Sequence, residues 1–215
     1  MMIEPRYHPL YARFWSWYFR TIIRSDFASF SVMDNIQTDP EHSILLLQNH
    51  ISWWDGFWAY HLNDLYFGRR FHVMMLEEEL AKRRFLTYAG AFSVQKNSRS
   101  IIQSLNFCAQ LLRSPENLLL LFPQGKIESL QIPQLSFGKG VIRVLEQARA
   151  HTQVIYACAL PDYFSDRKPH LRLYLKHIPN GELGQITDWM QDFNEFYTIS
   201  KTRQLLHPEQ ENNQA

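Results

Sequence analysis

Short apolar runs alternate with longer stretches of helical periodicity along most of the chain. The runs are SILLLQ (43–48), FHVMML (71–76), AFSVQ (91–95), NLLLLFP (117–123) and TQVIYACAL (152–160). Continuous apolar runs of this length are typical of strands that are buried on both faces, as in a parallel sheet. A further run, LRLYLKH (171–177), alternates apolar and polar residues, which predicts a half-exposed strand at an edge of the sheet.

The stretches between these runs predict helices. We expect helices over 53–67, 98–114, 137–150 and 186–206, and a helix or turn over 78–90. Ser52 would cap the first helix, and Pro115 would stop the second. Strands that alternate with helices predict an α/β layered domain, with a mostly parallel or mixed central sheet flanked by helices.

Residues 9–24, PLYARFWSWYFRTIIR, predict an amphipathic helix with Pro9 in its first turn. Its apolar stripe consists of Leu10, Tyr11, Phe14, Trp15, Tyr18 and Ile22, and Arg13, Arg20 and Arg24 fall on the other side. Two interpretations are open: the helix lies in the interface of a membrane, or it packs on the core of its own domain. The density of Trp and Tyr favours the membrane surface.

The length of 215 residues indicates one main domain with a real core. We divide the chain into an N-terminal amphipathic, membrane-surface segment (1–30), a main domain (31–206) and a polar tail (207–215). The first residues, MMIEPRYHPL, lack the apolar core of a signal peptide. No apolar run approaches the roughly 18 residues that span a bilayer.

The net charge of +1 and the pI of about 7.8 give no electrostatic reason to expect a nucleic-acid partner. The two cysteines, Cys108 and Cys158, lie too far apart to suggest a zinc site or a disulfide framework. We interpret them as small core residues. A reducing, cytoplasmic setting fits this usage.

Polar residues follow three of the predicted strands, where sites collect in parallel sheets. They are Asn49 and His50 after SILLLQ, Lys96 after AFSVQ, and Pro123, Gln124, Gly125 and Lys126 at the end of NLLLLF. A Pro-x-Gly turn exposes backbone N–H groups. With the cations Lys96, Arg99 and Lys126, this turn could hold a phosphate or another anion. The alternative is an ordinary turn with solvated lysines.

His50 is followed five positions later by Asp55, in the first turn of the next predicted helix. A carboxylate bonded to Nδ1–H fixes the tautomer of the ring and leaves Nε2 free as a base. No Gly-x-Ser-x-Gly motif supplies a serine nucleophile, so the base would act on a hydroxyl of a bound substrate. The pair alone is weak evidence, because His72 and His177 have a Glu at the same offset.

Taken together, four blocks resemble the glycerolipid acyltransferase family, typified by bacterial 1-acyl-glycerol-3-phosphate acyltransferases. The Asn-His-x4-Asp block is matched by 49–55, and the Gly-x-Phe strand ending in a basic residue by 90–96. The third block, Phe-Pro-Glu-Gly-Thr-Arg-Ser, is partly matched by 122–128. The fourth, an apolar strand ending in Pro, is matched by 154–161.

The resemblance implies a mechanism without a metal, a bound cofactor or a covalent enzyme intermediate. His50, oriented by Asp55, would be the general base on an acceptor hydroxyl. The acyl donor would be a thioester of coenzyme A or acyl carrier protein. Substrate binding would fall to Asn49, Lys96, Arg99, Pro123, Gln124, Gly125 and Lys126. The partners would be the lipid acceptor, the acyl thioester and the inner face of the cytoplasmic membrane, with which the protein would associate peripherally.

The chain departs from the third block at Gln124 for Glu, Lys126 for Thr and Ile127 for Arg, and Lys96 replaces an Arg of the second block. Loss of bidentate Arg geometry is not a neutral change. The acceptor therefore stays open: lysophosphatidate, or another lipid alcohol such as an aminolipid, a glycolipid or a hydroxylated isoprenoid.

Two other functions compete with acyl transfer: a thioesterase or other hydrolase that uses the same pair on water, and a non-catalytic lipid-binding homologue. Trp53 and Trp54 also have two interpretations. They pack the helix onto the sheet, which we favour, or they line an acyl tunnel.

Overall fold

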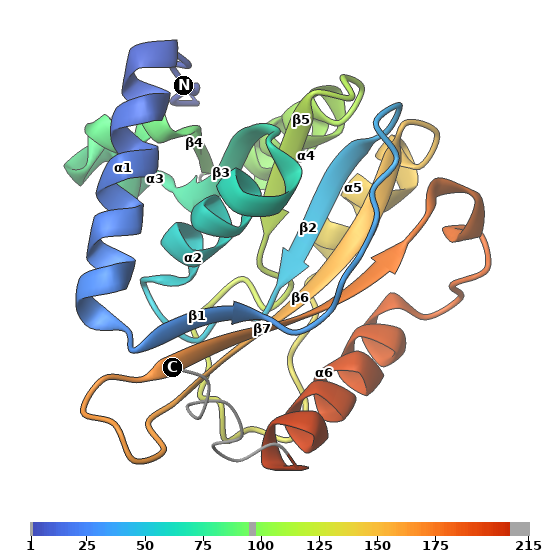
Figure 1. The fold of residues 1–215 in the computed structure, drawn as a ribbon. Helices are drawn as coiled ribbons and strands as arrows, with labels where there is room; N and C mark the ends of the chain where they lie inside the picture. Colours follow the sequence, from blue (N-terminus) through green and yellow to red (C-terminus); the bar gives the residue numbers. More distant parts are fainter. Residues whose placement is uncertain (1, 95–97, 207–215) are drawn as a thin grey trace.

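The protein is built on a seven-stranded mixed sheet with helices on both faces (Figure 1). The structure is a computed structural model that describes residues 2–94 and 98–206. The strands are β1 (Ser29–Val32), β2 (Ser43–Gln48), β3 (Arg70–Leu76), β4 (Ala91–Val94), β5 (Asn117–Leu121), β6 (Thr152–Asp162) and β7 (His170–Ile178). Their order across the sheet is β1-β7-β6-β2-β5-β3-β4. The predicted α/β class is confirmed.

The helices follow the predicted sequence of elements closely. They are α1 (Pro9–Asp26), α2 (Asp55–Leu62), its π-helical continuation η1 (Asn63–Phe67), α3 (Glu77–Lys82), the 3-10 helix η2 (Arg84–Ala89), α4 (Ser98–Leu111), α5 (Lys139–Ala148), the short η3 (Asn180–Glu182) and α6 (Trp189–Leu206). The predicted polar tail 207–215 lies outside the described residues.

The apolar runs form strands that are buried on both faces. In β2, Ile44 and Leu46 pack with α1 and α2, whereas Leu45 and Leu47 pack with α4, α5 and α6. Successive side chains of a strand point to opposite faces, so a strand between two helical layers must be apolar at every position. Strands β2, β3, β4, β5 and β6 are parallel, which brings the carboxyl ends of β2 and β5 together.

The strand predicted at an edge, β7, is instead an inner strand. It pairs antiparallel with β6 and parallel with β1, which occupies the edge. Leu171, Leu173 and Leu175 are buried beneath the layer of α1 and α2. β1 was not predicted, because its four residues, SFSV, form too short a run to stand out.

The helix predicted over 53–67 begins later than expected. Its first residue is Asp55, and no side chain caps it. The hydroxyl of Ser52 accepts a bond from the Trp54 N–H instead (3.2 Å), so the predicted cap is wrong. The last five residues form π-helix, which ends at the left-handed Gly68.

Helix α1 presents different faces to the domain and to solvent. Trp15, Phe19 and Ile23 are buried against the α2 side of the sheet, and the ring of Phe19 stacks on Phe57 at 4.6 Å. One face of this helix thus packs on the core of its own domain, as the second of the two interpretations predicts. Other aromatic residues stay exposed, among them Trp17 at 61%. None of the helices in the described ranges is long and apolar enough to cross a bilayer.

Candidate active site

His50 and Asp55 meet where β2 gives way to α2. His50 Nδ1 lies 2.7 Å from Asp55 Oδ2, and the same oxygen accepts from the N–H groups of Ile51 (2.6 Å) and Ser52 (2.9 Å). Asp55 is fully buried in the first turn of α2, where the helix dipole favours a negative charge. The chain between the two residues therefore curls around the carboxylate.

Burial disfavours the ionised form of the Asp55 carboxyl group. Desolvation raises its pKa, and the bonds from His50, Ser52 and Ile51 offset only part of that effect. Oδ1 is buried and has no hydrogen-bond partner among the described residues. The hydrogen bonds to the carboxylate from these groups thus all fall on the oxygen that faces the imidazole.

The backbone and ring of His50 are held by the loop that follows β5. The ring stacks on Phe122. The His50 N–H donates to Gln124 Oε1 (2.6 Å), and the His50 carbonyl accepts from Gln124 Nε2 (3.2 Å) and from the Glu128 N–H (2.8 Å). Gln124, predicted to bind substrate, lies with both polar atoms on the backbone of His50.

Asn49 is also engaged by backbone. Its Nδ2 donates to the Ala159 carbonyl (3.0 Å) and its Oδ1 accepts from the Ala159 N–H (2.7 Å). These bonds prolong the pairing of β2 with β6 past the end of the ladder. The side chain, predicted to contact substrate, is fully buried and anchors the strand end that carries His50.

The predicted anion-binding group is only partly described. Gly125 has a φ of +65°, and its N–H donates to the Phe122 carbonyl (3.1 Å) rather than pointing outward. The amine of Lys126 is well exposed and lies 3.1 Å from Glu128 Oε1. Lys96 and the side chain of Arg99 lie outside the described residues. Pro123 is buried in the same turn, and its carbonyl accepts from Gly138 N–H (2.7 Å).

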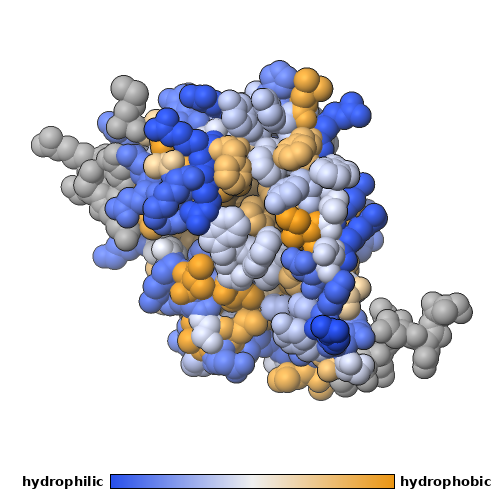
Figure 2. Space-filling view, turned by 90° about the vertical axis from the view of Figure 1, so that its left-hand side faces the viewer, coloured by the Kyte–Doolittle hydropathy of each residue, from blue (hydrophilic) through white to orange (hydrophobic). Residues whose placement is uncertain are grey.

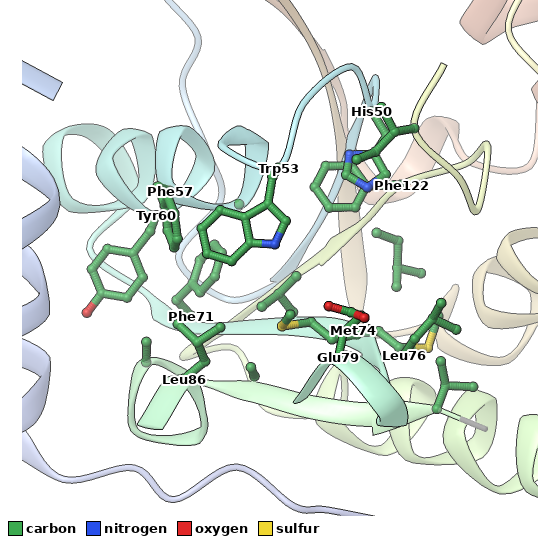
Figure 3. A pocket seen from close by; sticks show the side chains of 18 of the residues that line it. His50, Trp53, Phe57, Tyr60, Phe71, Met74, Leu76, Glu79, Leu86 and Phe122 are labelled. Atoms are coloured by element: carbon green, nitrogen blue, oxygen red, sulfur yellow. The ribbon is translucent and has the colours of Figure 1, made fainter. Parts of the chain in front are cut away.

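An apolar cavity of about 550 Å³ opens beside His50 (Figure 3). It lies between α2 on one side and β3, β4 and η2 on the other. Its walls include Trp53, Phe57, Tyr60, Phe71, Val73, Met74, Met75, Leu76, Leu86, Ala89, Leu121 and Phe122, with Phe19 from α1. Tyr60, Phe71 and Leu86 lie at the end away from His50, whereas Phe122 and Leu76 lie nearer to it (Figure 3).

Few charged groups reach this cavity. Among the described residues that line it, only Glu79 and Lys126 carry a full charge besides the titratable His50. Glu79 is paired with Lys82 (2.9 Å) and Arg83 (2.6 Å). Its place in the cavity wall was not predicted, because an acidic residue in a polar helix usually lies on the solvent-exposed face.

The two tryptophans of the His50 loop are largely exposed, so the favoured prediction that they pack in the core is wrong. Trp53 is 42% exposed, lines the cavity and lies under the guanidinium of Arg83 at 5.2 Å. Both residues precede the first turn of α2, and the core-facing positions of that helix are taken by Trp58 and Leu62. Sequence spacing alone could not show this, because the helix starts later than predicted.

Comparisons with known proteins agree on the kind of domain. Residues 29–160, more than half of the chain, match the family model described as Acyltransferase. No curated protein sequence matches the chain significantly. The fold is similar to the crystal structure of the 1-acyl-sn-glycerophosphate (LPA) acyltransferase PlsC from Thermotoga maritima, with a TM-score of 0.58 and 13% sequence identity over 91% of this chain and 78% of that chain. At this identity, the likeness concerns the fold.

Proposed function

Because the chain belongs to the acyltransferase family, we propose that it moves a fatty acyl group from a thioester to the hydroxyl of a lipid alcohol, with His50 as the general base. One observation carries the proposal: His50, bonded through Nδ1 to a buried carboxylate, stands beside a large apolar cavity. The donor would be a thioester of coenzyme A or of acyl carrier protein. The similar fold of PlsC, an acyltransferase of 1-acyl-sn-glycerophosphate, supports an acceptor of the same broad class.

The His50–Asp55 pair suits this chemistry. With Nδ1–H donated to Asp55, Nε2 is free to take the proton of the acceptor hydroxyl. The acceptor oxygen then attacks the thioester carbonyl, the C–O bond forms, and the C–S bond breaks as the tetrahedral intermediate collapses. The sulfur leaves with the proton that His50 had taken, so the residue is ready for the next turnover.

The cavity suits the acyl chain of the donor or the acceptor. Its volume of about 550 Å³ falls in the usual range of ligand pockets, and its walls are aliphatic and aromatic side chains. The reacting carbonyl would lie by His50, and the chain would run towards Tyr60 and Phe71. Trp53 would then line the tunnel.

The acceptor head group would bind at the loop after β5. Lys126 supplies an exposed cation there, with the turn of Pro123 and Gly125 beneath it. Lys96, which follows β4 in the sequence, and Arg99, in the first turn of α4, would complete the group. These residues suit an anionic head group such as that of lysophosphatidate, while a neutral lipid alcohol would use the same base without them.

The exposed face of α1 would bring the enzyme to its lipids. Phe14 and Trp17 project from this helix beside arginines, and Phe19 of the same helix lines the cavity. Figure 2 shows the face of the molecule that carries α1, where apolar patches lie among strongly hydrophilic ones. Aromatic residues with nearby arginines suit the headgroup region of a bilayer. We place the protein peripherally on the inner face of the cytoplasmic membrane.

Release of thiol from a long-chain acyl-coenzyme A tests the proposal. Wild type and His50→Ala would be assayed with lysophosphatidate and then with a total lipid extract, using labelled acyl groups. Acceptor-dependent release by wild type alone supports acyl transfer, and the labelled product names the acceptor. Release of free fatty acid without any acceptor would indicate a hydrolase. If no thiol is released, acyl carrier protein thioesters are assayed in the same way, and failure with both donors would contradict the proposal.

A further inference from the structure

Gln124 holds His50 through one planar group that both donates and accepts. Its Oε1 receives the His50 N–H at 2.6 Å, and its Nε2 donates to the His50 carbonyl at 3.2 Å. Gln124 is 7% exposed, and Phe122, two residues earlier in the same loop, stacks on the imidazole. The amide of the loop after β5 thus bonds both the N–H and the carbonyl of His50, as one strand bonds another in a sheet.

From these contacts we infer that Gln124 is a positioning residue for His50, and that in this chain it acts through an amide that donates and accepts at once. The inference rests on the proposed role of His50 as the base. Both polar atoms of the amide contact the His50 backbone, and the side chain also bonds the Glu128 carboxylate, so its contacts lie within the protein.

A carboxylate could not make the same pair of bonds. Glutamate, which the third block of the resembled family has at this position, has the same shape but only accepts hydrogen bonds when it is ionised. One of its oxygens would face the His50 carbonyl without a proton between them. The His50 carbonyl would retain only the bond from the Glu128 N–H (2.8 Å).

A charge at position 124 would also change the electrostatics of the imidazole. The described charged groups around it are Asp55 on α2, Glu79 on α3, and Lys126 and Glu128 in the loop after β5. Glu79 is paired with Lys82 and Arg83, and Glu128 with Lys126, whereas Asp55 bonds the ring directly. A further carboxylate within reach of His50 would favour its protonated form, which cannot act as a base. The amide of Gln124 fixes the backbone without this penalty.

Three variants test the inference. Gln124→Glu keeps the shape and adds a charge, and Gln124→Met keeps the approximate size and removes the bonds without a charge. Gln131→Glu introduces the same charge at an exposed glutamine of the same loop region and is the matched control. We would measure kcat, both KM values and the pH dependence of kcat/KM. NMR of ring-labelled histidine would follow proton uptake by His50 without requiring turnover.

We expect Gln124→Met to lower kcat about tenfold while both KM values stay within about twofold. Gln124→Glu should lower kcat at least as much and move the acid limb of the kcat/KM profile up by about one pH unit. His50 should take up its proton at correspondingly higher pH in the NMR titration. The control should match wild type in every measurement.

Two results would overturn the inference. One is a Gln124→Glu enzyme with the kcat, the pH profile and the NMR titration of wild type. The other is a rise in the KM of the acceptor alone, which would make Gln124 a binding residue. If wild type transfers no acyl group but the NMR titration shifts as expected, the proposed function fails while the role of Gln124 in holding His50 stands.

Discussion

The ring of Phe122 lies flat against the imidazole of His50, with the ring centroids 4.0 Å apart and the planes 11° apart. The two residues follow neighbouring parallel strands, β5 and β2, so the register of the sheet sets them side by side. Asp55 fixes the edge of the imidazole and Phe122 fixes its face. The ring therefore has little freedom to turn away from a bound substrate.

Phe122→Leu should remove the stacking on the imidazole while keeping an apolar side chain at the cavity wall. We expect kcat to fall by roughly 10- to 100-fold, because small misplacements of a catalytic group are costly. Steady-state kinetics with the natural acceptor would measure this. Phe107→Leu, which packs on Phe92 on the opposite face of the sheet, should retain the activity of wild type. Equal losses in both variants would contradict a specific role for the stacking.

Asp55→Asn should lower kcat strongly, and its effect on the free energy of unfolding should depend on pH. We expect kcat to fall by about 10³- to 10⁴-fold, because an amide stabilises neither the required tautomer nor the protonated ring. Burial raises the pKa of Asp55, so the fold binds this proton more tightly than the unfolded chain does, and the associated stability is lost as pH rises through the folded pKa. Denaturation of both proteins between pH 4 and pH 7 should show the stability difference moving in favour of the variant as pH rises. A difference that is constant with pH would contradict this.

His72 should make the fold sensitive to mild acid. It is buried in β3 beside Asn117, and burial lowers its pKa from 6.5 to about 4. The unfolded chain therefore binds the proton first, and stability falls as pH drops from about 6.5 to 4, by up to about 3 kcal/mol. His72→Gln should flatten the dependence of unfolding free energy on pH over this window. His151→Gln, at an exposed histidine, should leave that dependence as it is in wild type.

Ala89 should limit the length of the acyl chain. It lines the cavity, and together with Tyr60 and Phe71 it also lines a smaller neighbouring pocket. Ala89→Phe should shorten the longest chain that is accepted and lower its kcat/KM by at least about tenfold, while shorter chains react normally. A series of saturated acyl donors measures the cutoff. Ala150→Leu, at an exposed position, provides the control, and an unchanged cutoff in the Ala89 variant would place the chain elsewhere.

The exposed aromatics of α1 should control binding to lipid. Replacing both Phe14 and Trp17 by Ala removes exposed apolar surface and keeps the buried Trp15, Phe19 and Ile23, although it removes the edge contact of Phe14 with Trp15. Sedimentation with vesicles that contain phosphatidylglycerol should show a loss of at least about tenfold in binding. Tyr163→Ala, an equally exposed aromatic of the β6–β7 connection, should bind as wild type does. Unchanged binding of the double variant would reject the proposed membrane surface.

Local patterns were sufficient to predict the strands of the sheet centre and the pairing of His50 with Asp55. β2 was predicted with its observed ends, since a strand between two helical layers needs apolar residues throughout. The carboxylate reaches the imidazole through only five residues of chain, so the short sequence already defines the turn.

Long-range register could not be predicted in the same way. The pairing of β1 with β7 joins Ser29 to His170, and nothing in four residues of β1 specifies so distant a partner. The backbone contacts of Asn49 and Gln124 could not be predicted for the same reason. Each amide contacts backbone that is far away in sequence, and a polar side chain after a strand looks the same whether it binds substrate or backbone.

The order of the strands dictates when the site can exist during synthesis. β2 is made early, but the strands on either side of it, β5 and β6, follow long after, and Ser43 pairs with Thr152. A nascent chain that stops short of β6 contains His50, Asp55 and Gln124 yet lacks Ala159, which anchors the end of β2. Strand pairings between residues so far apart in sequence form slowly, and the apolar strands stay unpaired in the meantime. We therefore expect nearly the whole polypeptide to be synthesised before β6 anchors the end of β2 that carries His50, so β2 lacks one of its two neighbouring strands until then.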